Sequence, residues 1–287
     1  MSEYTKEHYA RSPMGVIGAG TLGRRIALML ASRGAEVRLF DTNEKALLDG
    51  FSYVKENLPV QVKKTDDGRM GKIVPVKTIS EAVDGTWLVV EAVPENVNLK
   101  RTILEELDSL SSSNTIIASN SSSFPSSELI NNVTNPNRVL SAHFYMPPNL
   151  IPVEIMSSGK TEPFYIQRLL DVFPLLGLKP FHVRVDSVGL IFNRIWAAIK
   201  RESLYVVAQG VSKPVEVDEI FEMVIGANKG PFRLMDQVGL DVVLDIEEHY
   251  AHLRQGLPIE VRALLKEYID KGWLGVKTGR GFYNDYK

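Results

Sequence analysis

The first half of the chain alternates short apolar runs with segments of helical periodicity. The apolar runs, which are typical of buried strands, cover residues 14–17, 37–40, 88–90, 115–118 and 139–142. Apolar residues at helical spacing occupy residues 21–33 and 95–110. Strands that alternate with helices predict a mostly parallel sheet with helices on both faces, which is the doubly wound α/β class.

After about residue 186 the pattern becomes helical throughout. Residues 193–207 are apolar on most sides, which predicts a helix buried in a core or in a subunit interface. Residues 215–225 and 258–271 are two further expected helices, and a glycine follows each of them. We therefore expect two domains, an α/β domain over residues 1–186 and an all-α domain over residues 187–287.

Composition excludes several classes of protein. The chain has 287 residues, no cysteine and a net formal charge of -2. Without cysteine there is no disulfide, thiolate metal ligand or cysteine nucleophile, and we predict no metal site. The near-neutral charge argues against nucleic-acid binding, which needs a basic face. No apolar run approaches the roughly 20 residues of a membrane-spanning helix, and the first twelve residues are polar. We expect a cytoplasmic protein that binds neither nucleic acid nor membrane.

A glycine-rich turn follows the first expected strand and opens the first expected helix. It has the G-x-G-x-x-G pattern of dinucleotide-binding folds, in which the glycines permit a tight turn, the approach of a pyrophosphate and close packing of the helix. Asp41 ends the second strand, where its carboxylate would accept hydrogen bonds from ribose hydroxyls and repel a 2′-phosphate. The pattern predicts NAD rather than NADP, although a glycine-rich turn in an unrelated α/β protein is the alternative. The expected cofactor-binding residues here are Gly18, Gly20, Thr21, Leu22, Gly23 and Asp41.

A histidine and a glutamate follow in positions suited to proton transfer. His143 ends the strand at 139–142, and the carboxyl ends of strands are where open α/β sheets bind ligands. Glu154 lies in the apolar segment 152–156, where a carboxylate is costly unless it has a partner. A histidine is a natural partner, because the carboxylate would fix its tautomer and stabilise the imidazolium. These two residues alone leave open whether they form a catalytic pair or a core histidine beside an edge-strand charge.

Two more polar segments are candidates for contacts with a substrate or cofactor. Residues 119–123 follow a strand, so their hydroxyls and amide could orient a substrate or a nicotinamide; a polar turn or helix cap is the alternative. Asp186 or Ser187 would cap the next helix. Asn193, four residues after Gly189, would then share a helical face with it and supply an amide donor.

Together these segments resemble the L-3-hydroxyacyl-CoA dehydrogenase family, from about residue 14 to residue 286. The resemblance rests on motifs that occur in order: Gly18-x-Gly20-x-x-Gly23, Glu91-Ala92-Val93-Pro94-Glu95-Asn96 with Lys100, Ser119-Asn120-Ser121-Ser122-Ser123, His143-Phe144-Tyr145, Val153-Glu154, Asp186-x-x-Gly189-x-x-x-Asn193-Arg194, and residues 230–241 and 277–283. It implies a Rossmann-type NAD-binding domain followed by a helical domain that pairs subunits.

The resemblance also implies roles for individual residues. His143 would be the general base that removes the proton of a secondary alcohol, and Glu154 would orient and polarise it. Ser122 would bind the reacting oxygen of the substrate, and Asn193 would also polarise the substrate. Glu95, Lys100 and Lys277 match positions that contact the nicotinamide half of NAD. Asn120 is expected to contact the cofactor as well.

Three departures from the family pattern bear on the substrate. Met146 stands where the family usually has an asparagine that touches the cofactor. The segment 51–78 is short where the family inserts a helical hairpin that carries CoA contacts, and the loop before Gly230 is shortened too. Details at 93–95 and 147–152 are closer to the gulonate and carnitine 3-dehydrogenases, which use free hydroxy acids.

Three functions therefore compete. The leading one is NAD-dependent interconversion of a 3-hydroxyacyl substrate, as a CoA thioester, and its 3-keto form. The second keeps the chemistry and replaces the thioester with a free 3-hydroxy acid. The third is a structural NAD-binding protein without turnover, which has no need to retain His143, Glu154, Ser122 and Asn193 together. We expect a homodimer formed through the C-terminal helices.

Overall fold

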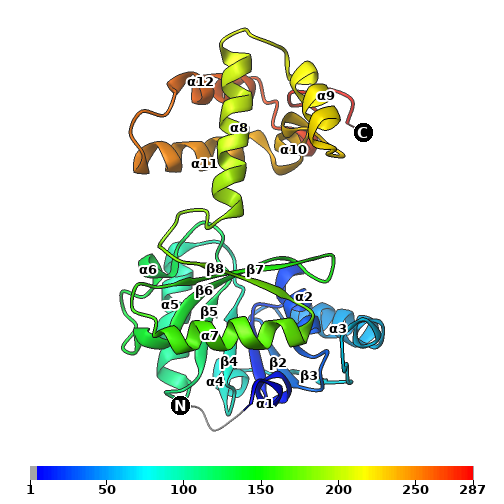
Figure 1. The fold of residues 1–287 in the computed structure, drawn as a ribbon, viewed down its shortest axis with the longest axis vertical. Helices are drawn as coiled ribbons and strands as arrows, with labels where there is room; N and C mark the ends of the chain where they lie inside the picture. Colours follow the sequence, from blue (N-terminus) through cyan, green and yellow to red (C-terminus); the bar gives the residue numbers. More distant parts are fainter. Residues whose placement is uncertain (1–4, 287) are drawn as a thin grey trace. The chain divides into compact units, whose positions relative to one another are not determined.

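An eight-stranded sheet forms the centre of the first of two units (Figure 1). The computed structural model describes residues 5–286, and its units are Met1–Ile191 and Phe192–Lys287. The strands are β1 (Met14–Ile17), β2 (Glu36–Phe40), β3 (Lys72–Pro75), β4 (Leu88–Glu91), β5 (Ile116–Ser119), β6 (Val139–Met146), β7 (Leu150–Ser157) and β8 (Lys179–Val183), in the spatial order β3-β2-β1-β4-β5-β6-β7-β8. Strands β1 to β6 are parallel, whereas β7 runs antiparallel to β6 and parallel to β8. The expected mostly parallel sheet is confirmed.

Alternating side chains on the central strands fill a separate core on each face of the sheet. Val16 of β1 belongs to one core and its neighbour Ile17 to the other, as the period of two requires. The first core is covered by α1 (Lys6–Arg11), α2 (Thr21–Leu30), α3 (Glu44–Lys64) and α7 (Pro163–Val172), and the second by α4 (Ile79–Val83), α5 (Val97–Leu110) and α6 (Ser126–Leu129). Short 3-10 helices occur at Pro136–Arg138 and Phe173–Leu176.

The segment after β2 is a single long helix. Helix α3 has 21 residues and is capped by Asn43, whose side chain accepts a hydrogen bond from the amide of Ala46. A turn at residues 66–68 then leads to the edge strand β3. Between β2 and β4 the described chain therefore has one long helix, a turn, the edge strand β3 and the short helix α4.

The second unit is entirely helical, as expected. Its helices are α8 (Phe192–Ala208), α9 (Pro214–Ile225), α10 (Pro231–Val238), α11 (Leu240–Leu253), α12 (Ile259–Asp270) and a 3-10 helix at Val276–Thr278. Leu204, Phe232, Val243 and Leu265 are among the residues that form its core. In the part of the chain that is described, no helix is long and apolar enough to cross a membrane.

One local expectation is wrong. Helix α8 begins at Phe192, so neither Asp186 nor Ser187 caps it. Gly189 and Leu190 have φ angles of 77° and 51°, in the left-handed region that interrupts a right-handed helix. Gly189 and Asn193 therefore do not share a helical face. The Ser187 hydroxyl instead donates to the Leu190 carbonyl and closes a turn before the helix.

Candidate active site

The glycine-rich turn joins β1 to α2 and leaves an open space beside Gly20. Gly18 has a φ angle of 102°, which favours glycine. A Cβ atom on Gly23 would lie 1.8 Å from the Gly18 carbonyl oxygen. Only glycine at position 23 therefore lets the helix pack this closely against the turn. A Cβ atom on Gly20, in contrast, would have no heavy atom within 4 Å. The space in front of Gly20 can therefore receive a ligand.

The first turn of α2 is free to bind an anion. Gly20 caps the helix without a side-chain hydrogen bond, and the first turn, which begins at Thr21 and Leu22, contains no acidic residue. The first amides of a helix carry a partial positive charge and need acceptors from outside the helix. A pyrophosphate at this point would satisfy them.

Asp41 reaches this turn from the end of β2. One of its carboxylate oxygens accepts a hydrogen bond from the Ala19 amide at 2.7 Å, and the other accepts one from the Asn43 amide at 2.8 Å. A carboxylate has about four lone-pair sites, so two sites are left for the hydroxyls of a ribose. The turn and Asp41 together therefore fit a dinucleotide.

His143 and Glu154 occupy opposite positions in the antiparallel pair of β6 and β7. Both are buried, with 7% and 3% of their surface exposed. The Nδ1 atom of His143 lies 3.8 Å from Oε2 of Glu154, which is an ion-pair distance for a protonated histidine and too long for a hydrogen bond. The hairpin thus produces the pairing that the sequence suggested.

Tyr145 is a third member of this cluster, and the sequence analysis did not identify it as a site residue. Its ring centroid lies 4.7 Å from that of His143, two residues away on the same face of β6. Burial, followed by the negative charge of the nearby Glu154 carboxylate, raises the pKa of Tyr145. The amide of Ile191 also donates to Glu154 at 3.2 Å. Period-two spacing from His143 was the signal that could have indicated Tyr145.

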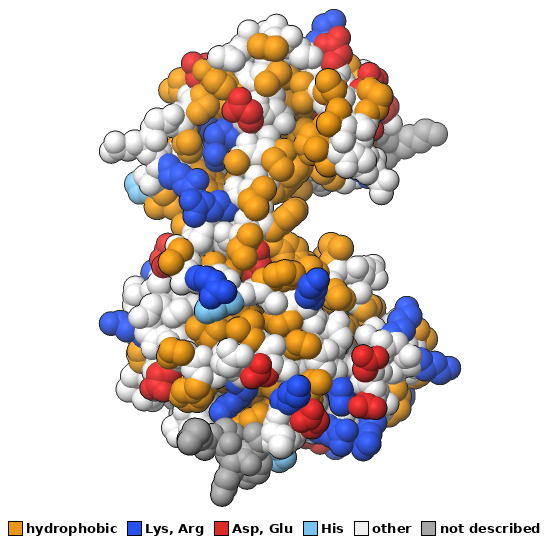
Figure 2. Space-filling view, viewed as in Figure 1, with side chains coloured by type: hydrophobic (Ala, Val, Ile, Leu, Met, Phe, Trp, Pro, Cys, Tyr) orange, Lys and Arg blue, Asp and Glu red, His pale blue; other side chains and the backbone are white. Residues whose placement is uncertain are grey.

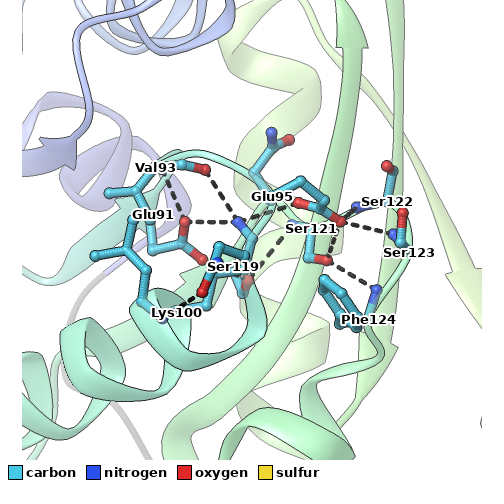
Figure 3. Close-up of polar contacts among 12 residues, drawn as sticks. Glu91, Val93, Glu95, Lys100, Ser119, Ser121, Ser122, Ser123 and Phe124 are labelled. Carbon is cyan, nitrogen blue, oxygen red and sulfur yellow. Dashed lines mark hydrogen bonds and ion pairs between the residues drawn. The ribbon is translucent and has the colours of Figure 1, made fainter. Parts of the chain in front are cut away.

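A buried ionic network lies at the carboxyl ends of β4 and β5 (Figure 3). Glu91 and Lys100 are almost completely buried and 2.9 Å apart. Lys100 also donates to the Val93 carbonyl at 3.2 Å and lies 3.3 Å from Glu95. The Ser119 hydroxyl donates to the second oxygen of Glu91 at 2.6 Å. The ammonium of Lys100 is surrounded by protein acceptors, so in this structure it positions Glu95.

Glu95 in turn holds the serine-rich turn after β5 (Figure 3). Its Oε1 atom accepts hydrogen bonds from the Ser121 hydroxyl at 2.6 Å and from the amides of Ser122 and Ser123 at 3.1 and 2.9 Å. Burial would raise the pKa of Glu95, but the bonds from Ser121 and Ser123 and the charge of Lys100 outweigh it, so that its pKa is lowered. The carboxylate is therefore charged and fixes the backbone of Ser122.

Asn120 links this turn to the strand that carries the histidine. Its side-chain oxygen accepts a hydrogen bond from the Phe144 amide at 2.8 Å, next to His143. Ser122, whose side chain is half-buried, follows two residues later. The turn and the end of β6 are thereby held together, so the predicted residues Asn120, Ser122 and His143 belong to one region of the first unit.

The two remaining predicted residues belong to the second unit. Asn193 lies in the first turn of α8 and is half-buried. Lys277 lies in the 3-10 helix at Val276–Thr278 and forms an ion pair with Asp241 at 2.5 Å. Among the described residues 5–286, no group of three histidine or acidic side chains could hold a metal ion.

Comparison with known proteins identifies the family. The model of the 3-hydroxyacyl-CoA dehydrogenase NAD binding domain matches residues 13–187, and that of the C-terminal domain of the same family matches residues 189–285. The chain belongs to the 3-hydroxyacyl-CoA dehydrogenase family. The glycine-rich turn and Asp41 lie inside its NAD binding domain, so the cofactor is NAD.

Several known proteins resemble this chain over nearly its whole length. The probable 3-hydroxybutyryl-CoA dehydrogenase of Bacillus subtilis (strain 168) is 33% identical over 284 residues, which cover 95% of this chain and 96% of that protein. The crystal structure of (S)-3-hydroxybutyryl-CoA dehydrogenase from Ralstonia eutropha has a TM-score of 0.84 at 29% identity and covers 96% of this chain and 99% of that one. A pyridine carboxylate 5-dehydrogenase of Mesorhizobium japonicum is 29% identical over 94% of this chain and 89% of that protein.

Proposed function

We propose that this member of the family is an NAD-dependent dehydrogenase that interconverts a 3-hydroxyacyl substrate, as a CoA thioester, and its 3-keto form. The single observation that carries the proposal is the buried pair of His143 and Glu154 on the hairpin of β6 and β7. The names of two relatives that resemble the chain over nearly its whole length, both 3-hydroxybutyryl-CoA dehydrogenases, support the substrate class. The free 3-hydroxy acid is the second candidate, because α3 replaces the hairpin that carries CoA contacts in the family.

His143 acts as the general base in this proposal. NAD, when bound, supplies the acceptor for the hydride that leaves the alcohol carbon. The Nδ1 atom of His143 faces Glu154, so Nε2 is the nitrogen that takes the hydroxyl proton of the substrate. The imidazolium that forms lies beside the Glu154 carboxylate, which stabilises the positive charge in a buried setting. A positioned base of this kind contributes roughly 10²–10⁴-fold to the rate.

Ser122 is the proposed donor to the reacting oxygen in the first unit. Its backbone amide is fixed by Glu95, and Lys100 and Glu91 hold that carboxylate in turn. A preorganised donor stabilises the charge that develops on the oxygen. Asn193, which belongs to the second unit, keeps the substrate-polarising role that the family resemblance implies.

A substrate panel tests the proposal. Oxidation of NADH is measured with acetoacetyl-CoA and longer 3-ketoacyl-CoA substrates, and reduction of NAD with free 3-hydroxy acids. We expect the wild-type protein to turn over at least one 3-ketoacyl-CoA. The His143→Gln variant should not turn over that substrate. Turnover only on free acids would select the second candidate, and the absence of turnover on the whole panel would reject both.

We further propose that the protein is a homodimer that associates through its C-terminal helices. Helix α9 exposes Ile220, Met223 and Val224, which share one helical face and are 60%, 77% and 75% exposed. Figure 2 shows hydrophobic side chains on the surface of the second unit, where Figure 1 draws α9. Contiguous apolar surface of this kind marks protein–protein contacts, and two-fold dimers are the commonest assembly.

Sedimentation tests the dimer. The wild-type protein is expected to sediment as a dimer at micromolar concentration, and Met223→Glu as a monomer, because a buried charge opposes association. Asn228→Glu, in the exposed loop after α9, is the matched control and should remain dimeric. A wild-type monomer would contradict the proposal.

A further inference from the structure

Two adjacent arginines follow the glycine-rich turn. Arg24 and Arg25 come directly after Gly23 in α2, and both are half-buried. Their guanidinium carbons lie 4.9 and 5.6 Å from the centroid of the Tyr53 ring, which belongs to α3. The ion pairs within residues 5–286 include neither arginine.

This arrangement leaves positive charge without a negative partner in the described chain. The Nε atoms of Arg24 and Arg25 are buried and have no hydrogen-bond partner among the described residues. Two neighbouring charges of the same sign repel each other, and partial burial removes water that would stabilise them. Stacking on Tyr53 orients the planar groups without neutralising them. Guanidinium groups bind carboxylates and phosphates with two parallel hydrogen bonds, so an anion from outside the chain would resolve the imbalance.

The arginine pair is connected to the hairpin that carries the proposed base. Arg25 donates a hydrogen bond from Nη1 to the Pro147 carbonyl at 3.1 Å. Pro147 follows β6 directly and lies four residues after His143. Four residues of extended chain span at most about 14 Å. An anion held by the arginines could thus belong to the same molecule that reacts at His143.

We propose that Arg24 and Arg25, stacked on Tyr53, bind the anionic end of the substrate. The group is a phosphate of a CoA thioester or the carboxylate of a free acid, which present the same chemistry to a guanidinium. This inference rests on the proposed function, since it concerns the part of that substrate remote from the reacting carbon.

The phosphates of NAD are the competing ligand, because the same helix begins at the dinucleotide turn. The amides at Gly20, Thr21 and Leu22 are available to the pyrophosphate, whereas the arginines lie one turn further along α2 and one of them contacts the β6–β7 hairpin. Binding of the cofactor and binding of the substrate by the arginines can therefore be distinguished by which binding constant changes when the arginines are replaced. The affinity for NADH reports the first, and the KM for charged substrates reports the second.

The experiment compares charged and neutral forms of one substrate. The double variant Arg24→Gln/Arg25→Gln is assayed with a 3-ketoacyl-CoA, with the same acyl group on N-acetylcysteamine, which has no phosphate, and with free 3-hydroxy acids. Lys63→Gln/Lys64→Gln, which removes two exposed charges at the end of α3, is the matched control. We expect the KM for the charged substrate to rise about 10- to 100-fold in the arginine variant only. The KM for the neutral thioester and the Kd for NADH should change less than about twofold.

Several results would overturn the inference. An equal loss of NADH affinity would assign the arginines to the cofactor, and an equal loss with the neutral thioester would make them structural. Calorimetric titration with CoA and with the free acids provides a readout that is independent of turnover. If the wild-type protein turns over no substrate, the proposed function fails, but tighter anion binding by the wild type than by the arginine variant would still support the pair. Equal anion binding by the two proteins would reject it.

Discussion

The Glu154 carboxylate serves both His143 and Tyr145. His143 faces it directly across the β6–β7 ladder with 3.8 Å between Nδ1 and Oε2, and Tyr145, two residues further along β6, interacts with the same carboxylate. The Ile191 amide takes a further position on it at 3.2 Å. The negative charge that would stabilise a protonated His143 is thus divided among three partners. This division has consequences for rate and for pH dependence.

The first prediction concerns His143 itself. His143→Gln should lower kcat by at least about 100-fold, because a positioned base contributes roughly 10²–10⁴-fold. The affinity for NADH, measured by fluorescence titration, should stay within about twofold, since the glycine-rich turn and Asp41 lie on other strands. His182→Gln on β8 is a suitable control and should leave kcat unchanged. More than about a tenth of the wild-type kcat in His143→Gln would rule out the general-base role.

The second prediction concerns Tyr145 and the pH profile. Burial and the charge of Glu154 raise the pKa of Tyr145, so its hydroxyl stays protonated beside that carboxylate across the assay range. In Tyr145→Phe the carboxylate loses this partner and stabilises the protonated His143 more strongly. Because alcohol oxidation needs the neutral base, the acidic limb of kcat/KM should move to higher pH by about half to one unit.

Two controls separate this effect from a structural one. Glu154→Gln removes the charge that acts on His143, so it should move the same limb to lower pH and reduce kcat. In the Glu154→Gln background, Tyr145→Phe should no longer shift the profile. A profile that keeps its position in Tyr145→Phe, with only kcat reduced, would show that Tyr145 fills space beside the histidine and does not share its carboxylate.

Much of the fold could be predicted because it depends on local pattern. The apolar runs, the helical segments and the glycine-rich turn each lie within about 15 residues, and the two-layered covering of the sheet follows from their alternation. The pattern does not predict helix α3, because this helix is polar over much of its length and contains Pro59, a residue that normally ends a helix. The turn at Gly189 and Leu190 was missed because a positive φ at a leucine has no sequence signal.

The candidate site likewise has a part that the sequence predicts and a part that depends on the folded structure. The spacing of His143 and Glu154 suggested a pair, and the hairpin register places them opposite each other. The roles of Glu91 and Tyr145 depend on which side chains come into contact once the sheet has formed. The sequence alone does not show whether a glutamate such as Glu91 is buried or exposed. The contacts of Lys100 with Glu91, Val93 and Glu95 depend on the folded sheet in the same way. A contact of Lys100 with the cofactor stays a prediction.

The third prediction concerns cofactor choice. Asp41 keeps lone pairs for ribose hydroxyls, and its charge repels a 2′-phosphate. The wild-type enzyme should therefore prefer NAD over NADP by about tenfold or more in kcat/KM, and Asp41→Ala should narrow the difference, chiefly through a loss with NAD. Asp49→Ala, on the exposed surface of α3, should leave the ratio unchanged. Equal use of the two cofactors by the wild type would contradict the role of Asp41.

The last prediction concerns Glu95 and the stability of the serine-rich turn. Three hydrogen bonds and the charge of Lys100 lower the pKa of Glu95 against the effect of burial, so the charged carboxylate stabilises the folded state. A lowered folded-state pKa means that this contribution is complete above the ordinary value of 4.5 and is lost as the pH falls through the folded-state value. The Glu95 side chain is 36% exposed, and solvent screens its interactions. Glu95→Gln should therefore reduce the free energy of unfolding at pH 7 by only about 0.5–1 kcal/mol, and the difference from wild type should shrink as the pH is lowered below 4.5. Glu106→Gln, an exposed change on α5, should show no comparable effect. Urea unfolding at a series of pH values measures both variants, and a difference for Glu95→Gln that stays constant with pH would show that the charge of this carboxylate does not stabilise the turn.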